Sequence, residues 1–102
     1  MASEEIVPAD LAFLEYILKA IVDFPDAVKV TRTIDQLGVL LTVVVDTKDM
    51  GTIIGKKGKT ANALRVLLRV IGAKENAHVN MKIIDTERKT EVVLDTFDDE
   101  KV

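Results

Sequence analysis

The sequence predicts an α+β domain whose elements follow the order helix, strand, strand, helix, helix, strand. Apolar residues recur at helical spacing over 8–24 and again over 59–71. Between these segments, residues 28–34 alternate apolar with polar side chains, and residues 39–45 are apolar at nearly every position. The first pattern is typical of a half-buried strand, and the second of a central strand covered by helices on one face. At 102 residues the chain is long enough for one domain with a core and too short for two.

The boundaries of the first elements follow from local sequence features. Pro8 suits the first turn of a helix, and Pro25 stops the helical pattern just after Phe24. The apolar positions of the first strand are Val28, Val30 and Ile34. Residues 35–38, with the sequence Asp-Gln-Leu-Gly, form the turn that leads into the second strand.

The remaining elements surround a loop rich in glycine and lysine. Ile53 and Ile54 precede this loop, and the helix expected over 59–71 follows it. Gly72 suits the C-terminal cap of that helix. Residues 80–85 then form the third strand. The loop therefore lies between two helices, at the centre of the predicted order.

The loop itself reads Gly55-Lys56-Lys57-Gly58 and is the most informative segment of the chain. Glycine has no Cβ, so the backbone can take left-handed dihedrals and a ligand can approach it closely. The helix that begins at about Lys59 directs unpaired N–H groups and the positive end of its dipole toward the same place. These features predict a site for a phosphate backbone, and an ordinary turn is the alternative.

Two common nucleotide-binding loops are disfavoured by Ile53. A Walker A loop and the dinucleotide fingerprint each need glycine at that position, where the backbone must approach the phosphates. What remains is the pattern G-x-x-G between two helices, which is the loop pattern of KH modules in RNA-binding proteins.

Charge is concentrated around this loop. Residues 46–74 carry seven basic and two acidic side chains, whereas each flanking part of the chain has four more acids than bases. Arg65 and Arg69 lie four residues apart, on one side of the expected helix. Because nonspecific affinity for nucleic acid scales with the number of phosphates neutralised, an acidic chain with one basic segment predicts a short contact.

Three stretches of the sequence resemble the type II KH domain, and more closely the KhpA-like family of small stand-alone bacterial KH proteins. They are residues 23–28 (DFPDAV), residues 51–65 around the loop, and residues 79–85. The resemblance covers about residues 6–86. It implies a three-stranded mixed sheet backed by three helices on one face, with the third strand parallel to the second. It also implies single-stranded RNA held in a cleft between the loop and the sheet edge.

The candidate binding residues fall into three groups. Gly55 to Gly58, with Lys56 and Lys57, are expected to hold the phosphates of about four nucleotides. Ile53 and Ile54 are expected to form an apolar floor for the bases, and at least one of them to belong to the core. The positive rim is assigned to Lys59, Arg65 and Arg69. Because the cleft needs unstacked bases, single strands are expected to bind and duplex DNA is not.

No catalytic, cofactor or metal site is expected. The chain has no cysteine, its one histidine, His78, lies in an expected turn, and its one serine is Ser3. Asp46 and Asp49 flank the loop without His or Cys beside them, which is a poor set for a transition metal, and Asp49 suits a helix cap. The acidic N-terminus and the lack of a long apolar run predict a cytoplasmic protein without a membrane span.

Partners and the C-terminal segment leave alternatives open. A homodimer or a second KH-domain protein is plausible, because Val66 and Val70 widen the apolar arc of the helix after the loop. A BolA-like module and a protein-interaction module without an RNA role are the rival interpretations. Residues 87–102 form an acidic tail, in which residues 91–94 are either a short extra strand or a packed turn.

Overall fold

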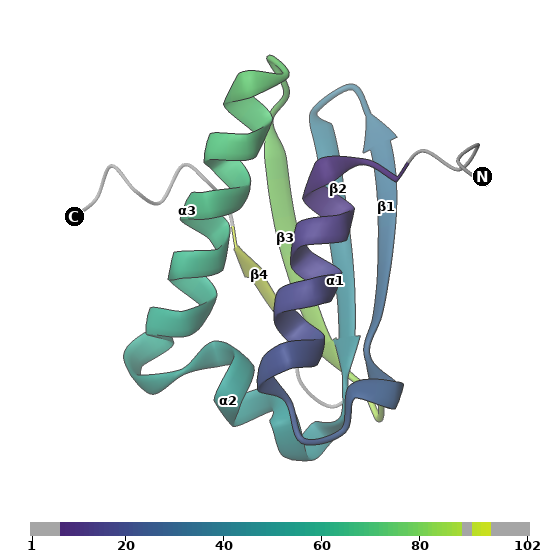
Figure 1. The fold of residues 1–102 in the computed structure, drawn as a ribbon, viewed down its shortest axis with the longest axis vertical. Coiled ribbons are helices and arrows are strands. Elements are labelled where there is room, and N and C mark those ends of the chain that lie inside the picture. Colours follow the sequence, from purple (N-terminus) through teal and green to yellow (C-terminus); the bar gives the residue numbers. More distant parts are fainter. Residues whose placement is uncertain (1–6, 89–90, 95–102) are drawn as a thin grey trace.

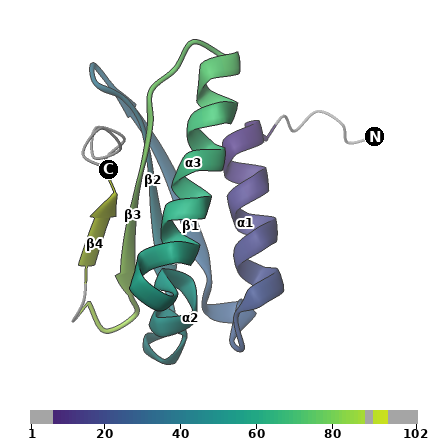
Figure 2. The same cartoon turned by 90° about the vertical axis from the view of Figure 1, so that its left-hand side faces the viewer.

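The computed structural model describes residues 7–88 and 91–94, and it consists of a mixed sheet with helices on one face (Figures 1 and 2). The helices are α1 (Ala9–Ile21), α2 (Met50–Ile54) and α3 (Lys59–Lys74). The strands are β1 (Lys29–Asp35), β2 (Gly38–Val45), β3 (Val79–Asp85) and β4 (Glu91–Leu94). Short 3-10 turns occupy Pro25–Ala27, Thr47–Asp49 and Lys56–Gly58. The first six helices and strands follow the predicted order.

The sheet has the strand order β1-β2-β3-β4 within the described residues. β1 and β2 form an antiparallel hairpin, β2 and β3 are parallel as expected, and β4 pairs antiparallel with β3. The expectation of three strands was therefore wrong, and residues 91–94 form a strand. Four residues are too few for a periodic pattern to be read, but Val92 packs against the core, which explains why the segment adds to the sheet. The predicted acidic tail beyond residue 94 lies outside the described residues, as do residues 89–90.

The core lies between the sheet and the helices. Every second residue of β2 and of β3 is buried, and these side chains face α1 and α3. The residues with no exposed surface include Leu14, Leu18, Leu41, Val43, Val45, Ile53 and Ile83. Burial of this apolar surface is the main force that holds the helices on the sheet. Leu40, Val44 and Ile84 are half-buried on the opposite face, where Figure 2 shows no helix.

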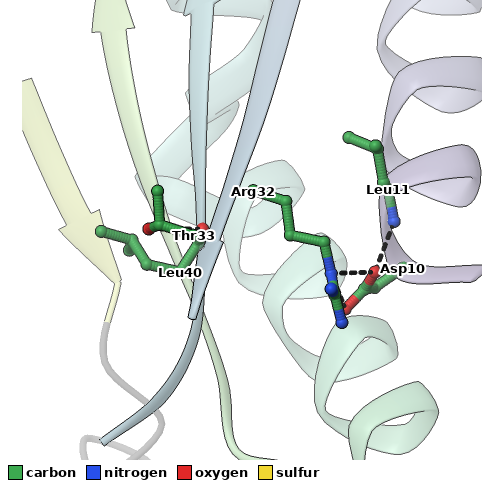
Figure 3. A network of polar contacts seen from close by, with 5 residues as sticks. All are labelled: Asp10, Leu11, Arg32, Thr33 and Leu40. Atoms are coloured by element: carbon green, nitrogen blue, oxygen red, sulfur yellow. Dashed lines mark hydrogen bonds and ion pairs between the residues drawn. The ribbon is translucent and has the colours of Figure 1, made fainter. Parts of the chain in front are cut away.

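β1 is joined to α1 by an ion pair rather than by apolar contacts alone. Arg32 Nε donates to Asp10 Oδ1 at 3.0 Å, and the same carboxylate oxygen accepts from the Leu11 backbone N–H at 2.7 Å (Figure 3). The last three residues of β1 are exposed. Ile34, expected on the covered side, is 67% exposed because it lies near the hairpin end of the strand.

The ends of two helices differ from the sequence expectation. α1 ends at Ile21 rather than Phe24, because Val22 is already extended (φ −91°, ψ 161°) and a 3-10 turn begins at Pro25. α3 continues past Gly72 to Lys74. Gly72 is buried there, and its carbonyl accepts hydrogen bonds from the N–H groups of residues 75 and 77. The glycine thus serves close packing inside the last turn, and not a cap.

Candidate nucleic-acid interface

The loop between α2 and α3 has positive φ at three of its four residues. Gly55 has φ 80° and ψ 172°, Lys57 has φ 57° and Gly58 has φ 76°. The Gly55 N–H donates to the Gly51 carbonyl at 2.8 Å, and the Gly58 N–H donates to the Gly55 carbonyl at 3.1 Å. These bonds fix a tight turn whose middle residues, Lys56 and Lys57, project from the fold.

The two glycines of the loop are required for different reasons. A Cβ on Gly55 would lie 2.7 Å from the Thr60 backbone nitrogen, and the backbone region of Gly55 is one that only glycine adopts readily. A Cβ on Gly58 would meet no atom within 4 Å, so there only the left-handed dihedrals favour glycine. Gly55 therefore brings the loop against the first turn of α3, and Gly58 turns the chain into that helix.

The positive charge of the loop is exposed. Lys56, Lys57 and Lys59 are all solvent-exposed, and the ion pairs Arg32–Asp10 and Lys82–Glu91 join side chains outside the loop. Loop hydrogen bonds use the N–H groups of Gly55, Gly58 and Lys59. Within the described part of the chain, no backbone hydrogen bond uses the N–H groups of Lys56 and Lys57. The loop thus offers two N–H donors and three ammonium groups at the N-terminal end of a 16-residue helix.

The two isoleucines before the loop have different roles. Ile53 has no exposed surface and belongs to the core, as expected of at least one of the pair. Ile54 is half-buried and packs against the core from its margin. Of the two isoleucines, only Ile54 has exposed apolar surface beside the loop that bases could contact. The buried Ile53 side chain is not accessible for such a contact.

The two arginines of α3 are less exposed than a positive rim requires. Arg65 is only 5% exposed, and its guanidinium donates a hydrogen bond to Asn62 Oδ1. Arg69 is half-buried. Both lie on the flank of α3 turned away from Ile71, since a helix rotates about 100° per residue. Ile71 lines a cavity together with Pro8, at the beginning of α1, so the arginine flank faces away from α1.

A buried carboxylate that the sequence suggested as a simple helix cap has another role. Asp49 is 1% exposed, and its side chain makes no cap hydrogen bond to α2. Its Oδ1 accepts from the Asp23 N–H at 3.0 Å, and its Oδ2 accepts from the Phe24 N–H at 3.1 Å. Asp49 therefore ties the segment after α1 to the beginning of α2. Nothing local in the sequence indicates this contact, because its partners lie 25 and 26 residues away.

The other polar groups that the sequence singled out make local contacts or are exposed. Asp46 accepts a hydrogen bond from the Lys48 N–H at 2.8 Å and caps the 3-10 turn before α2. His78 is exposed, just before β3. The described residues contain no group of three metal-ligating side chains. None of the described helices is long and apolar enough to cross a membrane.

The segment that contains this loop matches a known protein family. A family model described as the KH domain of KhpA/KhpB matches residues 12–83. The chain belongs to this family. Membership favours the KH interpretation over the BolA-like one, and β4 lies beyond the matched segment.

Curated relatives agree with this assignment. Three proteins named RNA-binding protein KhpA come from Clostridium acetobutylicum, Borreliella burgdorferi and Leifsonia xyli. The first is 39% identical over 71 residues, which are 70% of this chain and 95% of the relative. The second is 36% identical over 76 residues, 74% of this chain and 93% of the relative, and the third is 36% identical over 72 residues, 71% and 92%. All three are shorter than this chain. No solved structure matches it significantly.

Proposed function

We propose that this KH-family chain is an RNA-binding protein with the type II KH fold, and that its Gly55–Gly58 loop grips the backbone of single-stranded RNA. One observation carries the proposal. Two exposed lysines project between two positive-φ glycines at the N-terminus of α3, inside the segment that matches the family. The names of the curated relatives support the same ligand.

The loop would hold phosphate in two ways. The N–H groups of Lys56 and Lys57 can donate to phosphate oxygens, and the dipole of α3 favours negative charge at the same end. The ammonium groups of these lysines and of Lys59 add charge-assisted contacts. Three or four phosphates are within the reach of such a cluster, which corresponds to about four nucleotides.

The bases would lie toward the sheet, along a cleft between the loop and the β3 side of the molecule. Ile54 supplies apolar surface at the loop end of that path. Arg69, half-buried on the adjoining flank of α3, adds positive charge farther along. Bases in a duplex are stacked and paired and cannot enter such a cleft, so the ligand is a single strand.

The proposed cellular role is binding rather than catalysis. A post-transcriptional or ribosome-associated RNA chaperone fits a domain that grips a few nucleotides of many RNAs. A second copy of the chain or another KH-domain protein is the proposed protein partner, since a longer RNA contact needs a second module. The outer surfaces of α1 and α3 are suited to that contact, because Tyr16, Leu67 and Val70 are exposed there, at 74%, 48% and 61%.

The proposal is tested by fluorescence anisotropy with a labelled single-stranded RNA and with duplex DNA. One domain should bind the RNA with a Kd on the order of micromolar or weaker, because few contacts are made. Neutralisation of about three or four phosphates gives a log–log salt slope of roughly −2 to −3. A slope steeper than about −6, or tight binding of duplex DNA, contradicts the proposal.

A further inference from the structure

β4 is an addition to the matched family segment. The family match ends at residue 83, and β4 begins at Glu91. The strand pairs with β3 over four residue pairs, from Ile84↔Glu91 to Met81↔Leu94. It is therefore a short edge strand on the side of β3 that β2 does not use.

The position of β4 coincides with the path assigned to the bases. β4 contacts α3 as well as β3, and both figures show it beside β3 on the α3 side of the molecule. Val92 is paired with the buried Ile83, so it faces the helices, and it packs against the core. The flank of α3 that carries Arg69 faces away from α1, and thus toward this edge. β4 occupies the sheet edge that the proposed RNA cleft requires.

The charge of β4 and of the sequence after it opposes RNA. Glu91 is exposed, and its Oε2 lies 2.8 Å from Lys82 Nζ, so this carboxylate engages the one lysine of β3. From residue 91 to the end of the chain there are five acidic residues and one basic residue. The Glu91 carboxylate on this edge repels phosphate, and it neutralises a lysine that phosphate could otherwise contact.

We propose that β4 is an intramolecular competitor of RNA, paired with the β3 edge in the free protein and displaced when single-stranded RNA occupies the cleft. This inference rests on the proposed function. Displacement is feasible because a four-residue strand at the edge of a sheet can open locally without global unfolding. The measured Kd is then the intrinsic Kd divided by the fraction of molecules in which β4 is not paired, so pairing of β4 weakens the apparent affinity.

A disulfide can lock β4 in place without truncating the chain. Ile84 and Glu91 are directly opposite each other, at a spacing of about 4.5–5.5 Å between Cα atoms in such pairs, which suits a disulfide. Both side chains lie on the sheet face without helices, and the natural chain has no cysteine. Ile84→Cys/Glu91→Cys in the full chain therefore gives locked and released states of one protein. The matched control is Thr31→Cys/Thr42→Cys, which joins another opposite pair on the same face, in the β1–β2 hairpin.

RNA affinity is measured by anisotropy for each protein, oxidised and reduced. The Ile84/Glu91 variant should bind single-stranded RNA at least about fivefold more weakly when oxidised, and the hairpin control should bind equally in both states. Val92→Pro, which disturbs β4 pairing without a charge change, should bind more tightly than the unmodified chain. Equal affinity of the locked and released states, or tighter binding when locked, overturns this inference and leaves the proposed function standing. Absence of RNA binding by the unmodified chain and all variants removes the proposed function, and this inference with it.

Discussion

The two ends of α2 differ in how they use charge. At its N-terminal end, Asp49 is buried and both of its carboxylate oxygens accept backbone N–H groups. At its C-terminal end, Lys56 and Lys57 are exposed on a turn shaped by Gly55. A helix of five residues is too short to be stable alone, so the buried end and Ile53 fix its position. The residue that stabilises this helix and the residues proposed to bind RNA thus lie only a few positions apart. Substitution of Asp49 should lower stability, whereas substitution of Lys56 and Lys57 should lower RNA affinity.

Asp49→Ala should have the largest effect on stability. It removes the buried acceptor of the Asp23 and Phe24 N–H groups, and hydrogen bonds to a charged group are worth about 1.5–3 kcal/mol each. We expect a loss of about 3 kcal/mol, seen as a fall in Tm of more than about 10 °C in thermal unfolding. The control, Asp46→Ala, removes an exposed cap and should lose about 1 kcal/mol. Equal losses for the two variants would contradict the anchoring role of Asp49.

Gly55→Ala and Gly58→Ala should differ in stability although both glycines have positive φ. Alanine at 55 meets the Thr60 backbone in a backbone region that excludes side chains, so we expect a loss of about 2–3 kcal/mol. Alanine at 58 is in open space and bears only the left-handed penalty of about 1–2 kcal/mol. Chemical denaturation of both variants measures the difference. A larger loss for Gly58→Ala would show that the contact with Thr60 does not set the requirement.

The sequence predicted the elements that local patterns define. The alternation in β1, the apolar run of β2 and the helical spacing in α3 are local properties, and the loop is recognisable from two glycines and two lysines. The parallel β2–β3 pairing came from the family resemblance. Burial of Arg65 and the contacts of Asp49 could not be predicted, because each depends on residues brought together only by the fold. The sequence did not decide whether residues 91–94 form a strand or a packed turn, because four residues next to a charged segment carry no periodic pattern.

Arg69→Ala should have a small effect on RNA binding compared with the loop. Arg69 is half-buried on α3, away from the turn that holds the phosphates, and supplies at most one charge-assisted contact. We expect affinity to fall by less than about tenfold in the anisotropy assay, because a single solvent-screened ion contact is worth about 1 kcal/mol or less, and tenfold corresponds to about 1.4 kcal/mol. A loss as large as that caused by changes in the loop would move the centre of the site to the flank of α3.

The most direct test of the account is Lys56→Asp/Lys57→Asp, measured for thermal stability and RNA affinity in the same buffer. Gly55 and Gly58 still shape the turn, and exposed substitutions usually change stability by no more than about 0.5 kcal/mol, so Tm should be nearly unchanged. RNA affinity should fall at least about 100-fold, because two charge-assisted contacts become repulsive. Lys19→Asp/Lys74→Asp alters the net charge equally at exposed sites outside the loop and should retain most of the affinity. A loop variant with unchanged Tm and unchanged RNA affinity would contradict the central claim that this loop is the binding site.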